Sequence, residues 1–328
     1  FDTSASGDLA FVLDESADMK ELVWVERDGT PRPVTSDRRD YALASLAPDG
    51  ATLAVRVGER EGGEGLWMLD LGTLAWQRPQ PRTGGQAGTR ACARCDWSAG
   101  VWTPDSRYLT LASDHAGTVN LVHQDADFRG AAEPLSPGPR AQIPWDWSPD
   151  GRFLLFADER KPGLWVYDRE TGETTPPADG QPDARGAQFH PGGQWIAYTI
   201  HPIDYRSTAA SHIWIRPFPG PGAPRQVGAE RGYGPQWSAA GDELFYHGDT
   251  HIMAVPVQDQ GDQLGTGQAV PLFEDRYVRH DMVGIGSFAV DPDGRFLMVR
   301  DGSGAPRPRI VIVQNFRTRL EELLPRRD

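Results

Sequence analysis

The fold of this chain is indicated by one phrase, Trp147-Ser148-Pro149-Asp150-Gly151-Arg152-Phe153-Leu154. Degenerate copies follow one another at a spacing of about 45 residues, which marks an array of one supersecondary unit. Proline restricts φ, aspartate can bond its own backbone and glycine accepts a positive φ, so the Pro-Asp-Gly triplet predicts a tight chain reversal. With the full copy, seven such reversals are predicted, and the degenerate copies begin at Ser4, Leu46, Trp102, Phe189, Trp237 and Val290.

One stretch, residues 143–176, shows what each unit contains. Ile143–Trp147 is predicted to be a first strand that ends at the Pro-Asp-Gly reversal. Phe153–Ala157 is almost wholly apolar, as expected of a strand covered on both faces. Leu164–Asp168 is predicted to be a third strand. Thr174–Pro176 is predicted to be a weak outer strand, because proline is tolerated at a sheet edge.

Four short strands repeated about an axis are typical of a β-propeller, so the sequence predicts an all-β propeller of four-stranded antiparallel blades. A β-sandwich would not place one turn phrase at the same point of every unit. The number of phrases favours seven blades, with six blades and an atypical end as the alternative. Residues 1–315 are interpreted as a single propeller domain. The tail, residues 316–328, contains Arg317–Leu324, which predicts a short amphipathic helix that Pro325 ends.

The first and last units are where the ring must close. The predicted second and third strands are Leu9–Leu13 and Leu22–Glu26 in the first unit, and Phe296–Val299 and Ile310–Gln314 in the seventh. The seventh unit has no clear fourth strand before Asn315. Closure by a strand from elsewhere in the chain and closure by residues preceding Phe1 are the two interpretations.

Neighbouring residues of the first strands have different expected roles. The residue two places before each turn proline or its equivalent is mostly large and apolar, which favours packing between blades: Thr3, Leu46, Trp102, Trp147, Phe189, Trp237 and Val290. The residue preceding each of these is expected to face the central channel: Asp2, Ser45, Val101, Asp146, Gln188, Gln236 and Ala289.

Composition excludes several kinds of partner. The 37 glycines and 28 prolines fit an all-β chain with many turns. The sequence contains no run of about 18 apolar residues, so no membrane insertion is expected. The net charge of −13 disfavours nonspecific binding to nucleic acid or to an anionic membrane surface. We expect a monomer.

The sequence offers no catalytic or metal motif. Cys92 and Cys95 supply at most half of a tetrahedral zinc site, so a local disulfide or free thiols are favoured over a metal site or redox catalysis. None of the eight histidines has the spacing of a metal-ligand motif. No catalytic residue, metal ligand or cofactor is therefore assigned. A propeller hydrolase or lyase, with a histidine or metal site gathered from several blades in the channel, is the alternative.

Several phrases resemble known families. The Pro-Asp-Gly blade resembles the WD40-like repeat of TolB-type bacterial propellers. Four phrases resemble propellers that follow bacterial serine/threonine kinase domains: Leu22–Gly29, Ile215–Gly222, Glu243–Tyr246 and Arg309–Phe316. The resemblance implies a bacterial sensor or binding module, outside the cytoplasm and associated with a kinase or other catalytic domain. The chain itself has no kinase motif and no Gly-x-Ser-x-Gly.

Propeller topology predicts where a partner would bind. The loops between second and third strands and those between blades lie on one face, which receives the long insertions. Tyrosine and arginine are enriched at binding hot spots. We therefore expect a protein, peptide or glycan to dock on this face, although long loops that are simply tolerated insertions are the alternative. The candidate binding residues are Arg38, Arg39, His201, Tyr205, Arg206, Arg231, Tyr233, Tyr277, Arg279 and His280.

Overall fold

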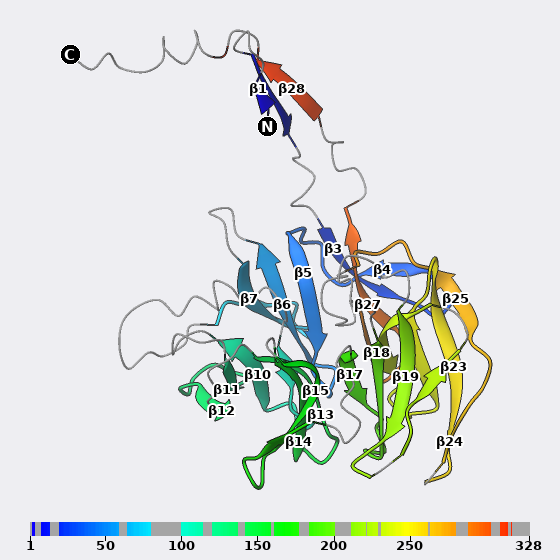
Figure 1. Ribbon diagram of the computed structural model, residues 1–328. Helices are drawn as coiled ribbons and strands as arrows, with labels where there is room; N and C mark the ends of the chain where they lie inside the picture. Colours follow the sequence, from blue (N-terminus) through cyan, green and yellow to red (C-terminus); the bar gives the residue numbers. More distant parts are fainter. Residues whose placement is uncertain are drawn as a thin grey trace.

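The computed structural model describes residues 2–3, 8–13, 20–58, 64–79, 100–113, 120–136, 142–158, 161–176, 184–200, 211–220, 222–228, 231–261, 263–279, 288–302, 309–313 and 316. The strands formed there build six antiparallel blades around a ring, and a separate three-stranded sheet (Figure 1). The prediction of an all-β propeller with four-stranded blades is confirmed. Within these ranges, no helix has the length and apolar character needed to cross a bilayer.

Five blades are continuous in sequence, and each runs from its innermost to its outermost strand. Blade 2 contains β5 (Tyr41–Leu46), β6 (Thr52–Gly58), β7 (Glu64–Asp70) and β8 (Trp76–Gln77). Blade 3 contains β9 (Val101–Trp102), β10 (Tyr108–Ser113), β11 (Asn120–Asp125) and β12 (Glu133–Ser136). Blade 4 contains β13 (Gln142–Trp147), β14 (Phe153–Asp158), β15 (Lys161–Asp168) and β16 (Thr174–Thr175).

Blades 5 and 6 continue the array. Blade 5 contains β17 (Ala184–Phe189), β18 (Trp195–Ile200), β19 (His212–Pro217) and β20 (Arg225–Val227). Blade 6 contains β21 (Tyr233–Trp237), β22 (Glu243–His247), β23 (His251–Asp259), β24 (Leu264–Thr266) and β25 (Val270–Glu274). The long β23 pairs with β25 along its first half and with β24 along its second half.

The remaining blade joins the two ends of the chain, and we call it the closure blade. Its inner strands are β26 (Phe288–Val290) and β27 (Phe296–Asp301), and its outer strands are β3 (Lys20–Val25) and β4 (Pro31–Pro33). The pairing of β27 with β3 extends from Phe296 opposite Val25 to Asp301 opposite Lys20. The ring is thus closed by strands from opposite ends of the chain, which was one of the two interpretations.

The prediction of seven blades is wrong, because the first and last units exchange strands. The predicted second strand of the first unit, β2 (Leu9–Leu13), pairs with β28 (Arg309–Val313) instead of β3. β1 (Asp2–Thr3) lies on the other side of β2, and Figure 1 shows this sheet apart from the six blades. The turn phrase identifies a hairpin but carries no information about the third strand that the hairpin will meet. The predicted helix over Arg317–Leu324 lies outside the described residues.

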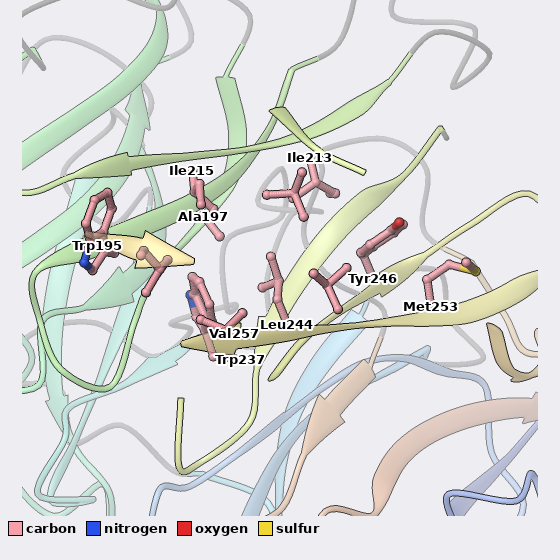
Figure 2. Close-up of a cluster of buried hydrophobic side chains, with 12 residues drawn as sticks. Trp195, Ala197, Ile213, Ile215, Trp237, Leu244, Tyr246, Met253 and Val257 are labelled. Carbon is pink, nitrogen blue, oxygen red and sulfur yellow. The ribbon is translucent and has the colours of Figure 1, made fainter. Parts of the chain in front are cut away.

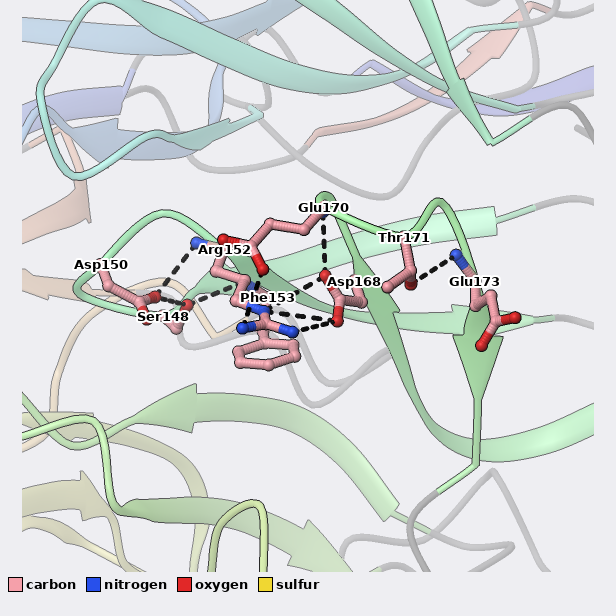
Figure 3. Close-up of polar contacts among 8 residues, drawn as sticks. All are labelled: Ser148, Asp150, Arg152, Phe153, Asp168, Glu170, Thr171 and Glu173. Carbon is pink, nitrogen blue, oxygen red and sulfur yellow. Dashed lines mark hydrogen bonds and ion pairs between the residues drawn. The ribbon is translucent and has the colours of Figure 1, made fainter.

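The turn phrase forms the same hydrogen-bonded reversal in blades 2 to 6, as blade 4 illustrates (Figure 3). The Ser148 N–H donates to the Phe153 carbonyl at 2.7 Å, and the Gly151 N–H donates back to the Ser148 carbonyl at 2.7 Å. Asp150 accepts from the Ser148 hydroxyl and, at 3.0 Å, from the Arg152 N–H. The Ser148 hydroxyl is the main reason why the pKa of Asp150 is lowered. The aspartate is therefore occupied by the turn itself.

Large side chains pack between blades, as expected. Figure 2 shows the cluster between blades 5 and 6, where Trp195 and Trp237 pack with Leu244 and other buried residues. Trp102 and Trp147 are buried, and each indole N–H donates to the preceding blade, to the Ser45 carbonyl at 3.1 Å and the Thr110 hydroxyl at 2.9 Å. The blade-to-blade role of these tryptophans is confirmed.

Candidate binding face

The ring has two faces. The turn face carries the Pro-Asp-Gly reversals and the turns from third to fourth strands, and the loop face carries the other connections. Six candidate residues lie at the loop face: Arg38 and Arg39 precede β5, Arg231 and Tyr233 are at the start of β21, and Tyr277 and Arg279 follow β25. The candidates His201, Tyr205, Arg206 and His280 lie outside the described residues.

One group of loop-face charges fastens the closure blade. Glu21, on β3, is 7% exposed. Its carboxylate forms ion pairs with Arg300 of β27 and with Arg38, which lies in the connection to β5. The hydrogen bond from Arg300 is the main reason why the pKa of Glu21 is lowered, despite its burial. Arg38 thus ties blade 2 to the paired chain ends. Its guanidinium is engaged in the fold, and part of it still faces solvent.

Arg39 has a packing role beside this group. Its guanidinium lies over Trp76 at 4.6 Å and over Trp67 at 5.0 Å from the ring centroids. It also forms an ion pair with Asp37 at 3.2 Å. Cation–π contacts and the ion pair hold the cation against blade 2. Arg39 is therefore less available to a partner than the sequence suggested.

A second group, the Asp275 cluster, lies between blade 6 and the closure blade. Asp275 and His247 have fully buried side chains, and His247 Nδ1 lies 2.6 Å from Asp275 Oδ2. Arg279 Nε lies 2.9 Å from the same oxygen. Tyr233 stacks on His247 at 4.8 Å between ring centroids, so the β21 and β22 strands hold the imidazole in place.

Electrostatics explain why the Asp275 cluster is stable. Burial alone would raise the pKa of Asp275, but the hydrogen bond from His247 and the nearby charge of Arg279 outweigh it, so the pKa is lowered. The ionised carboxylate fixes Arg279, whose Nη atoms also donate to the Asp249 carbonyl at 3.3 Å. The result is a cation held in one position at the rim, with 27% of its side chain exposed.

The remaining candidates differ in how much they can offer a partner. The Arg231 side chain is 49% exposed, and among the described residues its ion-pair contact is a long one, 3.9 Å to Asp249. Tyr233 is 5% exposed, and Tyr277 packs edge-on against Phe273, so both tyrosines belong largely to the packing. Burial raises the pKa of Tyr277. Arg231, Arg279 and Arg38 are the candidates that present cations.

Sequence reasoning missed His247 and Asp275. His247 ends the second strand of blade 6, and Asp275 follows an extra strand that the repeat does not predict. The residues are distant in sequence and their spacing matches no motif, so only the pairing of β23 with both β22 and β25 brings them together. A histidine at the loop-face end of a strand, directly after Leu244–Tyr246, was the available signal.

The channel was the expected place for a catalytic alternative. The residues expected to face it in the six blades are partly exposed, and Asp146 is the only ionisable one among them. Asp146 Oδ2 accepts from the Phe189 N–H of blade 5 at 2.7 Å, and burial raises its pKa to about 7. Within the described residues, no group of three or more histidine, cysteine, aspartate or glutamate residues could hold a metal ion. Cys92 and Cys95 lie outside them.

Comparison with known proteins yields the fold alone. No family model and no curated protein matches the sequence. A TolB-type protein from Agrobacterium tumefaciens superposes with a TM-score of 0.61 at 17% identity, covering 86% of this chain and 98% of the other. TolB from Acinetobacter baumannii gives a TM-score of 0.54 at 14% identity, covering 88% and 67%.

The ring is structurally similar to TolB-type propellers. An oligogalacturonate lyase in complex with manganese also superposes, with a TM-score of 0.51 at 15% identity, covering 94% of this chain and 82% of the lyase. The fold is thus shared with TolB-type propellers and with an enzyme. Because one propeller fold serves several functions, the function must be argued from the faces of this ring.

Proposed function

We propose that this protein is a non-catalytic binding or sensor module whose loop face docks a protein, peptide or glycan partner. The observation that supports this most is Arg279, a partly exposed cation fixed by the buried pair of Asp275 and His247. A group held in place before binding loses little conformational entropy when a partner arrives. A rigid ring is suited to positioning such groups.

The chemistry of the face favours an acidic group on the partner. Arg231, Arg279 and Arg38 each place a guanidinium on the loop face, in the sector that runs from blade 6 across the closure blade to blade 2. A guanidinium presents a planar fork of donors that matches a carboxylate or a phosphate. We infer a partner that offers carboxylates, as an acidic peptide segment or a uronic-acid glycan would.

We also propose that the module works outside the bacterial cytoplasm, next to a kinase or other catalytic domain. The support is the resemblance of phrases such as Leu22–Gly29 and Arg309–Phe316 to propellers that follow kinase domains. A module that only gates access to a catalytic domain is the structural variant of this proposal. The sequence of the gene around this segment tests the association directly.

The binding test uses a charge reversal on each face. Immobilised acidic and neutral peptides, and glycans with and without uronic acids, serve as probes. Arg231→Glu should weaken binding of the best acidic probe at least about tenfold, because it places a negative charge in the docking sector. The matched control is Arg129→Glu on the turn face, where the side chain is 85% exposed and only weakly paired.

Both variants should unfold at the wild-type temperature, because both side chains are exposed and form ion pairs of little net stability. Equal loss of binding in the two variants would show a nonspecific charge effect. Undiminished binding by Arg231→Glu would reject the loop face as the docking surface. Stoichiometric metal in the purified protein would instead favour the channel enzyme.

A further inference from the structure

On the turn face, opposite the proposed docking surface, a pocket opens between the closure blade and blade 2. Its volume is about 360 Å³, at the lower end of the range for small-molecule sites. It is lined by Trp24, Val34, Asp49, Gly50, Leu71, Leu74, Asp291, Pro292, Asp293 and Arg295. Acidic residues come from the turn phrases, and most of the apolar ones come from the outer strands and their turns.

Leu74 is the unusual wall of this pocket. It lies in the turn after β7, has a φ of +56° and is 48% exposed. The corresponding position in blade 4, one residue before the carbonyl that accepts from the turn aspartate, is Gly172 with a φ of +72°. A leucine in this conformation costs about 1 kcal/mol relative to glycine, and its exposure gives little in return.

The turn that presents Leu74 is well fixed. Asp70 Oδ1 accepts from the Thr73 N–H at 2.7 Å and from the Thr73 hydroxyl at 2.9 Å. These two hydrogen bonds are the main reason why the pKa of Asp70 is lowered. Leu74 therefore lines the pocket from a fixed turn, and Trp24 and Val34 are other apolar residues of the lining.

The lining of the pocket also contains acidic residues. Asp291 is 3% exposed and is neutralised by Arg295, whose Nη2 lies 2.6 Å from it and whose guanidinium also stacks over Trp24 at 4.7 Å. Asp293 is far more exposed and has only a long contact to Arg295, at 3.8 Å. Asp49 Oδ1 accepts from the Ala51 N–H at 2.9 Å, but Asp49 forms no ion pair within the described part of the chain. The lining thus contains three carboxylates and one guanidinium, and Asp49 and Asp293 have no close ion pair among the described residues.

We propose that this pocket binds an organic cation with an apolar tail, the cation against Asp49 and Asp293 and the tail against Leu74. A free alkylammonium and a lysine side chain followed by an apolar residue share this chemistry. The excess negative charge selects the sign of the ligand, and the leucine at a glycine-type position supplies the apolar contact. The site is independent of the proposed loop-face docking.

The test titrates the protein with two pairs of probes and follows chemical shifts. The first pair is hexylammonium and hexanol, and the second is acetyl-lysyl-leucinamide and acetyl-glutaminyl-leucinamide. In each pair the charged probe should bind at least about fivefold more tightly at low salt, and added salt should reduce the difference. If both charged probes saturate the site, an alkylammonium group with an apolar tail is enough for binding. If only the charged peptide saturates it, the pocket also contacts the peptide backbone next to the lysine.

Leu74→Asn separates the proposal from a folding defect. Asparagine tolerates a positive φ, so the variant should be as stable as the wild type, yet it should bind the charged probes about tenfold more weakly. Val270→Thr is the matched control, because Val270 is 45% exposed on β25 of blade 6 and does not line the pocket. Asp49→Asn combined with Asp293→Asn should abolish the preference for the charged probe.

The proposal is overturned if hexanol binds as well as hexylammonium, if neither charged probe saturates at millimolar concentration, or if Leu74→Asn binds like the wild type. None of these outcomes depends on the loop face, where binding is tested separately with Arg231→Glu. The two proposals can therefore fail separately.

Discussion

The turn face and the loop face of the ring use their charged residues differently. On the turn face, Asp105 and Asp150 each accept from a hydroxyl and a backbone N–H of their own turn. On the loop face, Glu21 and Asp275 each join strands that are distant in sequence. The repeat therefore occupies its own side chains in folding, and the features that can distinguish this propeller are those that occur once.

The turn face also links neighbouring blades. The Asp49 N–H of blade 2 donates to the Ser106 hydroxyl of blade 3 at 3.1 Å. His190 of blade 5 accepts from the Gly192 N–H at Nδ1 and donates from Nε2 to the Gly241 carbonyl of blade 6 at 2.9 Å. Both ring nitrogens are occupied, so this histidine is structural. The pocket beside Leu74 is the departure from this pattern.

The largest effect is expected at the loop face. Asp275→Asn removes the anion that faces both His247 and Arg279, and it should lower the free energy of unfolding by about 3 kcal/mol. Denaturant unfolding measures this loss of stability. The control is Asp249→Asn, whose side chain is 67% exposed and should change stability by less than about 0.5 kcal/mol. Equal stability of both variants would mean that the Asp275 cluster is dispensable for folding.

A smaller effect is expected where the turn face links blades 5 and 6. A Cβ at Gly241 would lie 2.5 Å from His190 Nε2, and the residue has a φ of +75°. Gly241→Ala should therefore cost about 2 kcal/mol, against about 1 kcal/mol for Gly172→Ala, where φ is +72° and the Cβ meets nothing within 4 Å. If the two substitutions lower the free energy of unfolding equally, the contact between His190 and Gly241 does not contribute to stability.

The smallest effect is a pH dependence at Asp146. Because its pKa is raised to about 7 in the folded protein, the native state keeps a proton that the unfolded chain loses above about pH 4. The stability from this group is present at low pH and is lost as pH rises toward 7. Asp146→Asn should gain about 1 kcal/mol relative to wild type between pH 5 and pH 8, after allowance for solvent at this partly exposed group.

Denaturant unfolding at a series of pH values measures this effect, and His123 should change the free energy of unfolding with pH in the opposite direction. It is 6% exposed between Tyr108 and Trp147, and burial, aided by the charge of Arg169, lowers its pKa. Its stabilising contribution is present above its ordinary pKa and is lost on acidification. His123→Phe should therefore lose less stability than wild type between pH 7 and pH 5. Parallel pH profiles for wild type and both variants would contradict the two assignments.

The sequence predicted the blades better than it predicted the ring. Pro-Asp-Gly reversals, the apolar second strands and the tryptophans that pack between blades depend on residues within about ten positions of one another, so local pattern sufficed. Arg38, Arg231 and Arg279 lie on the face where the order of strands in the repeat predicted them, and their role in binding stays a prediction. Arg39 and Tyr233, in contrast, are held by packing, which their residue types alone did not reveal.

By itself, the sequence determined that one hairpin-based unit recurs and that its Pro-Asp-Gly phrase forms a tight reversal. The tertiary structure alone decided that β27 pairs with β3 while β2 pairs with β28, and that Asp275 meets His247. The physical reason is that backbone hydrogen bonds between strands are the same for any partner, so pairing is chosen by closure of the whole ring and by side chains far apart in the chain.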